Sequence, residues 1–105
     1  MDITGFRQAV SRGRFEWRRH VLERLAERFT PQADILEVIA TGEQIEDYPT
    51  ERPFPSALMF ARASGRPLHI VVAYDLTNDR GYVITAYEPS LEDFEPDFRA
   101  RRKKS

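Results

Sequence analysis

The sequence of 105 residues contains no cysteine. This absence excludes disulfide bonds, a thiolate nucleophile and a cysteine-based metal site, and it is typical of proteins from the reducing cytosol. The sequence also lacks an apolar run long enough to span a membrane and the apolar stretch of a signal peptide. It has no P-loop, GxGxxG or GxSxG motif, and its two histidines fit no metal-ligand spacing. We therefore expect a cytoplasmic protein without a bound metal or cofactor.

Lysine is almost absent as well, because 14 of the 16 basic residues are arginine, the residue suited to bidentate phosphate contacts. The net charge of −1 conceals blocks of opposite sign. Residues 7–28 hold seven arginines and three glutamates, whereas residues 34–51 and 88–97 hold only acidic charges. Residues 99–104 are mostly basic. This segregation permits a basic face for nucleic acid, and it equally permits the opposite blocks to pair with each other.

The remaining composition is that of a folded protein, with 41% hydrophobic and 11% aromatic residues. The length allows one modest core but not two. We expect a single domain over residues 1–105, which ends in a basic tail at residues 103–105.

Hydrophobic periodicity predicts helices in the first part of the chain. Residues 2–10 form a candidate first helix. Residues 17–29 form a second helix with an apolar stripe, which consists of Trp17, Val21, Leu25 and Phe29. A third helix begins with Thr30 as its N-cap and ends at Gly42.

The second part of the chain changes to strand patterns, at residues 44–48, 57–63, 68–75 and 82–87. The face of the third strand that carries His69 and Val71 is apolar enough to be at least half buried. Ser90 and Asp93 predict the start of a short C-terminal helix. We expect an α+β fold with two to three N-terminal helices packed on a three- to four-stranded antiparallel sheet, followed by that short helix.

Two histidines are the only groups whose ordinary pKa lies near neutrality. His20 lies on the second predicted helix with Arg24 one turn later, and His69 lies on a central strand. If the helix packs across the sheet, the pair supplies a base for the ribose 2′-hydroxyl and an acid for the leaving 5′-oxygen, with Arg24 binding the phosphate. The alternative is a hydrogen-bonded strand histidine and a surface histidine, with the helix arginines solvated. Arg28, in particular, is expected to form a surface ion pair.

Further candidates would contact RNA. Tyr87 on the last strand donates to a phosphate or stacks on a base, or it simply packs. Basic and polar side chains that would contact the RNA backbone are Arg18, Arg19, Thr85, Arg99 and Arg102. A solubilising role for the last two is equally compatible with the sequence.

Several segments in this order resemble a small bacterial family that is known only as a domain of unknown function: residues 17–24, 42–49, 68–72 and 83–89. The resemblance covers residues 14–102, and the matching positions are His20, Arg24, His69, Thr85 and Tyr87, with Arg99 or Arg102 near the end. This family resembles the RelE/ParE-like toxins and, more loosely, the MqsR messenger-RNA interferases. The resemblance implies a RelE-like fold, RNA as the substrate, on the ribosome or free, and a cognate antitoxin, of the zinc-finger MqsA/YgiT type, as partner. Phe29 stands where a glycine is expected.

The first hypothesis is therefore a type II toxin–antitoxin toxin that acts as a metal-independent endoribonuclease. In this hypothesis His20 and His69 act as acid and base, Arg24 clamps the phosphate and Tyr87 is a secondary donor. The alternative is a non-catalytic cytosolic protein-interaction domain. A third possibility is a toxin directed at gyrase or DNA.

Overall fold

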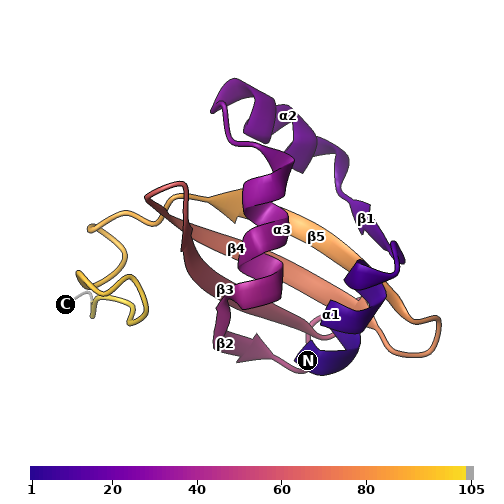
Figure 1. The fold of residues 1–105 in the computed structure, drawn as a ribbon. Coiled ribbons are helices and arrows are strands. Elements are labelled where there is room, and N and C mark those ends of the chain that lie inside the picture. The colour runs from indigo at the N-terminus through magenta and orange to yellow at the C-terminus, as the bar shows by residue number, and fades with distance from the viewer. Residues whose placement is uncertain (104–105) are drawn as a thin grey trace.

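The computed structural model describes residues 1–103, which form three helices and a five-stranded sheet (Figure 1). In chain order the elements are α1 (Ile3–Ser11), β1 (Phe15–Trp17), α2 (Arg19–Glu27), α3 (Gln32–Thr41), β2 (Glu43–Tyr48), β3 (Ser56–Ala63), β4 (Arg66–Asp75) and β5 (Arg80–Tyr87). The strand order is β1-β5-β4-β3-β2, and all neighbours are antiparallel except β1 and β5. The predicted α+β class is confirmed, with one strand more than the largest predicted sheet and one parallel pair.

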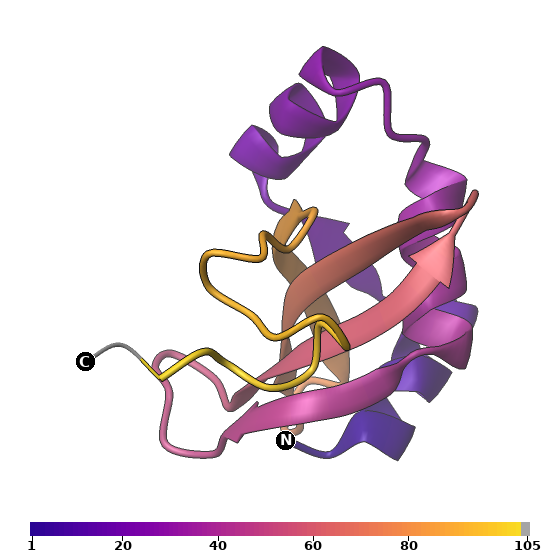
Figure 2. The ribbon, with the colours of Figure 1, turned by 90° about the vertical axis from the view of Figure 1, so that its left-hand side faces the viewer.

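Helices and C-terminal segment lie on opposite faces of the sheet. Helices α1 and α3 pack on one face, and residues 89–103 cross the other (Figure 2). Because strand side chains alternate, the even-numbered residues of β4 face the helices, and His69, Val71 and Ala73 face away. The core under the helices is apolar and fully buried, and it includes Phe6, Ile35, Val38, Ile70 and Val72.

The second helix is shorter than predicted. Phe15 and Trp17 pair with Gly81 and Val83 of β5, so Trp17 belongs to a strand and α2 begins only at Arg19. The prediction that Phe29 continues the buried stripe is wrong, because this side chain is 89% exposed. Its backbone is left-handed, with φ of 53°, which explains why a glycine is expected there. Val21 and Leu25 are buried as predicted.

Helix α3 begins one residue later than its predicted start. Pro31 is the N-cap and the Thr30 side chain makes no capping bond. Thr30 is instead buried, and its hydroxyl lies 3.4 Å from Arg66. The helix ends at Thr41, with Gly42 as the C-cap.

The predicted short C-terminal helix does not form in the described residues. A single turn closes between the Phe94 amide and the Ser90 carbonyl, at 3.0 Å, and the chain then turns back on itself through a Phe94–Arg101 bridge. We call residues 89–102 the C-terminal strap. Of the predicted basic tail, only Lys103 is described, and residues 104–105 lie outside the described residues. No described helix is long and apolar enough to cross a membrane.

Candidate functional site

The antiparallel register of β4 and β5 places His69 directly opposite Tyr87. The His69 side chain is completely buried. Its Nε2 lies 2.6 Å from the Phe98 carbonyl, which only accepts, so Nε2 carries the proton. In the neutral ring, Nδ1 is then an acceptor, and the Tyr87 hydroxyl donates to it at 3.3 Å. The two sequence candidates on the sheet are therefore hydrogen-bonded to each other.

Burial sets the protonation of this pair. Desolvation lowers the pKa of His69, against the opposing effects of the Phe98 carbonyl and the Glu46 carboxylate. Desolvation likewise raises the pKa of Tyr87. At neutral pH the imidazole is neutral and the phenol keeps its proton, so the hydroxyl donates and Nδ1 accepts.

The C-terminal strap covers His69 on the face opposite the helices. The Phe94 ring stands edge-on to the imidazole, with centroids 4.4 Å apart, and Phe60 of β3 packs at 5.5 Å. Arg101 of the strap forms a bidentate ion pair with Glu46, at 2.8 and 3.0 Å. Within residues 1–103, Tyr87 is partly exposed whereas His69 is not, so a ligand can approach this pair from the side of Tyr87.

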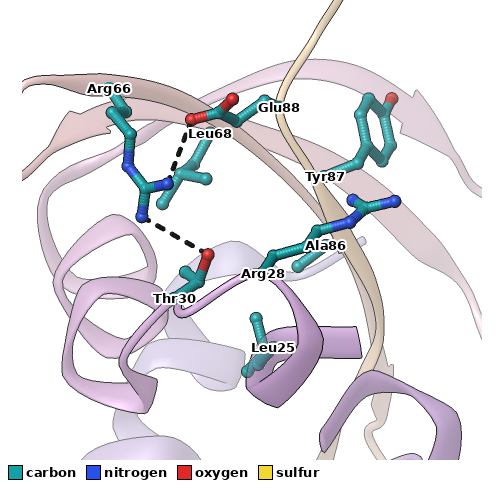
Figure 3. A pocket seen from close by; sticks show the side chains of 8 residues that line it. All are labelled: Leu25, Arg28, Thr30, Arg66, Leu68, Ala86, Tyr87 and Glu88. Carbon is teal, nitrogen blue, oxygen red and sulfur yellow. Dashed lines mark hydrogen bonds and ion pairs between the residues drawn. The ribbon is translucent and has the colours of Figure 1, made fainter. Parts of the chain in front are cut away.

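A cavity of about 440 Å³ lies beside Tyr87, where the end of α2 and the loop to α3 face the adjoining ends of β4 and β5 (Figure 3). Its lining residues are Leu25, Arg28, Thr30, Arg66, Leu68, Ala86, Tyr87 and Glu88. The Arg66 guanidinium lies 3.4 Å from both the Glu88 carboxylate and the Thr30 hydroxyl. Arg28, in contrast, has no ion-pair partner within residues 1–103. The two guanidinium groups and the one carboxylate leave the cavity with an excess of one positive charge above an apolar floor, which suits an anionic ligand.

The structure does not bring His20 and His69 into a shared cleft. His20 and Arg24 are exposed on α2, whereas the described hydrogen-bond and ring partners of His69 come from β3, β5 and the strap. Helix spacing places His20 and Arg24 on the same side of α2 as Arg28. The row formed by His20, Arg24 and Arg28 therefore ends at the cavity, and none of these three side chains is among the described partners of His69.

The predicted RNA contacts lie in four different environments. The Arg18 guanidinium lies 5.2 Å from the centre of the Tyr82 ring. Arg19 is 95% exposed and 3.5 Å from Glu23. Thr85 is half-buried on β5. The two strap candidates are in ion pairs, Arg99 with Glu43 and Arg102 with Glu95.

Three charged residues of the cavity are not among the site residues that the sequence predicts. The sequence predicts a surface ion pair for Arg28, and it assigns no site role to Arg66 or Glu88. The sequence could have predicted that Arg66 and Glu88 lie close together. In an antiparallel pair, the start of one strand lies beside the end of its partner, and these residues flank the predicted third and fourth strands there.

Within the described chain, no three histidine, aspartate or glutamate side chains are grouped so as to hold a metal ion. In a comparison with protein families, residues 17–88 match the family described as Domain of unknown function (DUF4258). No curated protein and no solved structure matches the chain. The matched region includes α2 and every residue that lines the cavity, whereas the strap follows it.

Proposed function

The chain belongs to the DUF4258 family, a domain of unknown function, and we propose that it is a metal-independent endoribonuclease of the cytoplasm, the toxin of a type II toxin–antitoxin pair. The observation that carries the proposal is Tyr87, whose hydroxyl donates to a neutral His69 and which is also among the residues that line a cavity with two arginines. Tyr87 can therefore take a proton from the RNA and pass its own proton to His69, next to a site that binds phosphate.

The arginines provide the binding half of the proposal. An RNA phosphate in the cavity is held by Arg28, and also by Arg66 in competition with the Glu88 carboxylate, and the same cations stabilise the extra negative charge of the phosphorane. Arg24 lies one turn from Arg28 on the same side of α2 and binds the neighbouring part of the backbone. His20 lies about 12 Å from Arg28 along the helix axis. We therefore assign His20 to the RNA backbone rather than to the scissile phosphate.

The Tyr87–His69 pair provides the chemical half. Tyr87 accepts the proton of the ribose 2′-hydroxyl while its own phenolic proton passes to Nδ1 of His69. The 2′-oxygen forms a bond to phosphorus, and the bond from phosphorus to the 5′-oxygen breaks. The leaving 5′-oxygen takes a proton from a water molecule, which gives a 2′,3′-cyclic phosphate and a 5′-hydroxyl. The hydroxide that remains then takes the extra proton back from His69 through Tyr87. His69 acts through Tyr87 and is thus a positioning and proton-accepting residue that does not touch the RNA.

The proposed partner is a cognate antitoxin, of the zinc-finger MqsA/YgiT type, and the proposed substrate is messenger RNA, on the ribosome or free. Both rest on the resemblance to RelE/ParE-like and MqsR-like toxins, which is an analogy of fold. The cavity supports a simple form of inhibition, in which the antitoxin covers Arg28 and Tyr87.

The direct test is cleavage of labelled single-stranded RNA by the purified protein in the presence of a chelator. We expect 2′,3′-cyclic phosphate ends. The Tyr87→Phe variant keeps the ring but loses the hydroxyl, and we expect kcat to fall by about 10²- to 10⁴-fold. Tyr74→Phe removes a hydroxyl from the opposite end of β4, where it bonds Asp79, so it is the matched control and keeps its activity. Absence of cleavage by the wild type, or full activity of Tyr87→Phe, contradicts the proposal.

One observation favours a second candidate, a non-catalytic protein-interaction domain. His69 is completely sealed by the strap, as expected of a histidine that only holds the fold together. In that case the exposed arginines of α2 bind an acidic protein partner. Induction of the protein is then harmless to cells, whereas an active toxin arrests growth and Tyr87→Phe relieves the arrest.

A further inference from the structure

A second cavity, of about 280 Å³, lies between the start of α2 and the loop that joins β2 to β3. Its floor consists of Val71, Ala73 and Ile84. Val71 and Ala73 lie on the face of β4 that carries His69, opposite the helices. We call this cavity the strand groove.

The Phe54 ring lines the strand groove, and Tyr82, which does not itself line it, supports that ring. The rings of Phe54 and Tyr82 are stacked, with centroids 5.4 Å apart and planes inclined by 6°. The Arg18 guanidinium lies over the Tyr82 ring at 5.2 Å. Arg18 and Phe54 both line the groove, so a planar ligand meets an aromatic ring and a planar cation there.

The charged groups at the groove favour an anionic ligand. Arg18, Arg52 and Glu51 line it, which leaves an excess of one positive charge. Neither arginine has an ion-pair partner in the described part of the chain, whereas most arginines of the strap and of the first loop are paired. Both guanidinium groups are thus available to a phosphate of the ligand.

From these features we infer that the strand groove binds one unstacked base of single-stranded RNA. This inference rests on the proposed endoribonuclease function and names a specificity site for it. Aromatic rings and guanidinium planes are the surfaces on which proteins stack single-stranded bases. The groove lies at the small end of ligand-pocket volumes, so it admits one ring system but not a helix.

The position of the groove fits a nucleotide next to the cleavage site. Val71 on the floor is two residues from His69, which is about 7 Å along β4. A base in the groove therefore belongs to a nucleotide whose phosphate lies near Tyr87. Arg18 stands at the N-terminal end of α2 and so connects the groove with the row of basic residues on that helix.

The test separates binding from cleavage by using a short single-stranded 2′-O-methyl RNA, which cannot undergo 2′-hydroxyl attack. Its dissociation constant is measured by fluorescence anisotropy, once with all bases and once with single abasic positions. We expect Phe54→Ala to weaken binding by about 5- to 150-fold. Phe54→Tyr keeps the ring and retains the affinity, so a loss in Phe54→Ala alone is not a general fault of the loop.

The abasic oligonucleotide identifies what the groove contacts. For the wild type, one abasic position weakens binding by about the same factor as Phe54→Ala, and in Phe54→Ala the same abasic position has little further effect. Arg18→Ala weakens binding more than Arg19→Ala, although both substitutions remove one positive charge from neighbouring positions.

The outcomes distinguish this inference from the proposed function. If the wild type cleaves RNA but Phe54→Ala binds as tightly as the wild type, the base site is overturned and the endoribonuclease stands. If binding depends on Phe54 and one base but no RNA is cleaved, the base site stands and the nuclease is overturned. If RNA does not bind and Phe54→Ala instead abolishes binding of a purified antitoxin, the groove is a protein interface and the inference is overturned.

Discussion

A single buried imidazole connects the sheet to the strap. His69 takes one hydrogen bond from β5 and donates one to the strap, and it makes ring contacts with Phe60, Tyr87 and Phe94. The alternation of apolar residues in β4 predicts that this histidine is at least half buried. It does not predict the Phe98 carbonyl, because that contact comes from a segment 29 residues further along the chain.

The burial of His69 predicts a pH dependence of stability. Its pKa in the folded chain lies below the ordinary value of 6.5. Between these two pKa values the unfolded chain binds a proton that the folded chain does not bind. The free energy of unfolding is therefore greatest above the ordinary pKa and decreases as the pH falls through it, by at most about 1.4 kcal/mol per pH unit for one proton. Urea unfolding from about pH 7.5 to 5.5, followed by the fluorescence of the one tryptophan, measures it.

Carboxylates titrate in the lower part of this range, so the control isolates the histidine. His69→Gln removes the titrating group, and we expect a flatter dependence of the unfolding free energy on pH. The exposed His20 is the matched position, and His20→Gln keeps the slope of the wild type. Equal slopes for all three proteins would show that the imidazole is not held neutral by the fold.

Periodic sequence patterns predict the helices and strands whose own residues show the period of that structure, but not those that depend on a distant segment. The strands of the β3–β4–β5 meander and the buried side of α2 follow from alternation and helical periodicity. Strand β1 does not, because its three residues are held by a parallel partner more than 60 residues away. Trp17 therefore reads as the first residue of a helical stripe, although its neighbours are on β5.

The strap shows the same limit at the other end of the chain. Ser90 and Asp93 have the spacing of a helix start, and one turn forms there. Pro96 then interrupts the backbone hydrogen bonds, and tertiary contacts determine the rest. Phe94 packs on His69 and Arg101 lies over the Phe94 ring. No periodic pattern within the segment encodes those contacts.

These contacts predict that the strap stabilises the whole fold. Phe94 is 2% exposed, and Phe94→Ala leaves a cavity above His69. We expect the free energy of unfolding to fall by about 3–5 kcal/mol, measured by urea unfolding. Leu91 lies in the same strap and is 53% exposed, so Leu91→Ala is the control and changes stability by less than about 1 kcal/mol. Similar losses for both variants would mean that the strap does not pack on the sheet as a defined layer.

The acidic and basic blocks of the sequence pair with each other at the strap, whereas within residues 1–103 helix α2 has one ion pair, Arg19–Glu23, which lies inside the helix. The acidic β2 pairs with the basic strap through Glu43–Arg99 and Glu46–Arg101. From the sequence, this pairing and a basic face are alternatives. In the structure, the pairing describes the surface at β2 and the strap, and the basic face describes the surface along α2. Arg28 at the end of α2 keeps its charge available beside the cavity.

This division makes a prediction about the salt dependence of RNA binding. Each phosphate contact adds about 0.7 to the slope of log K against log of the salt concentration for a single strand. Arg28→Gln should therefore lower the slope of the proposed complex by about that amount. Arg99→Gln removes the same charge from a residue that Glu43 already pairs, so the slope should stay close to that of the wild type. Anisotropy titrations with the uncleavable RNA at several salt concentrations measure both variants. Because the two substitutions change the net charge equally, equal slopes would show that the affinity follows the total charge and not the arginines of the cavity.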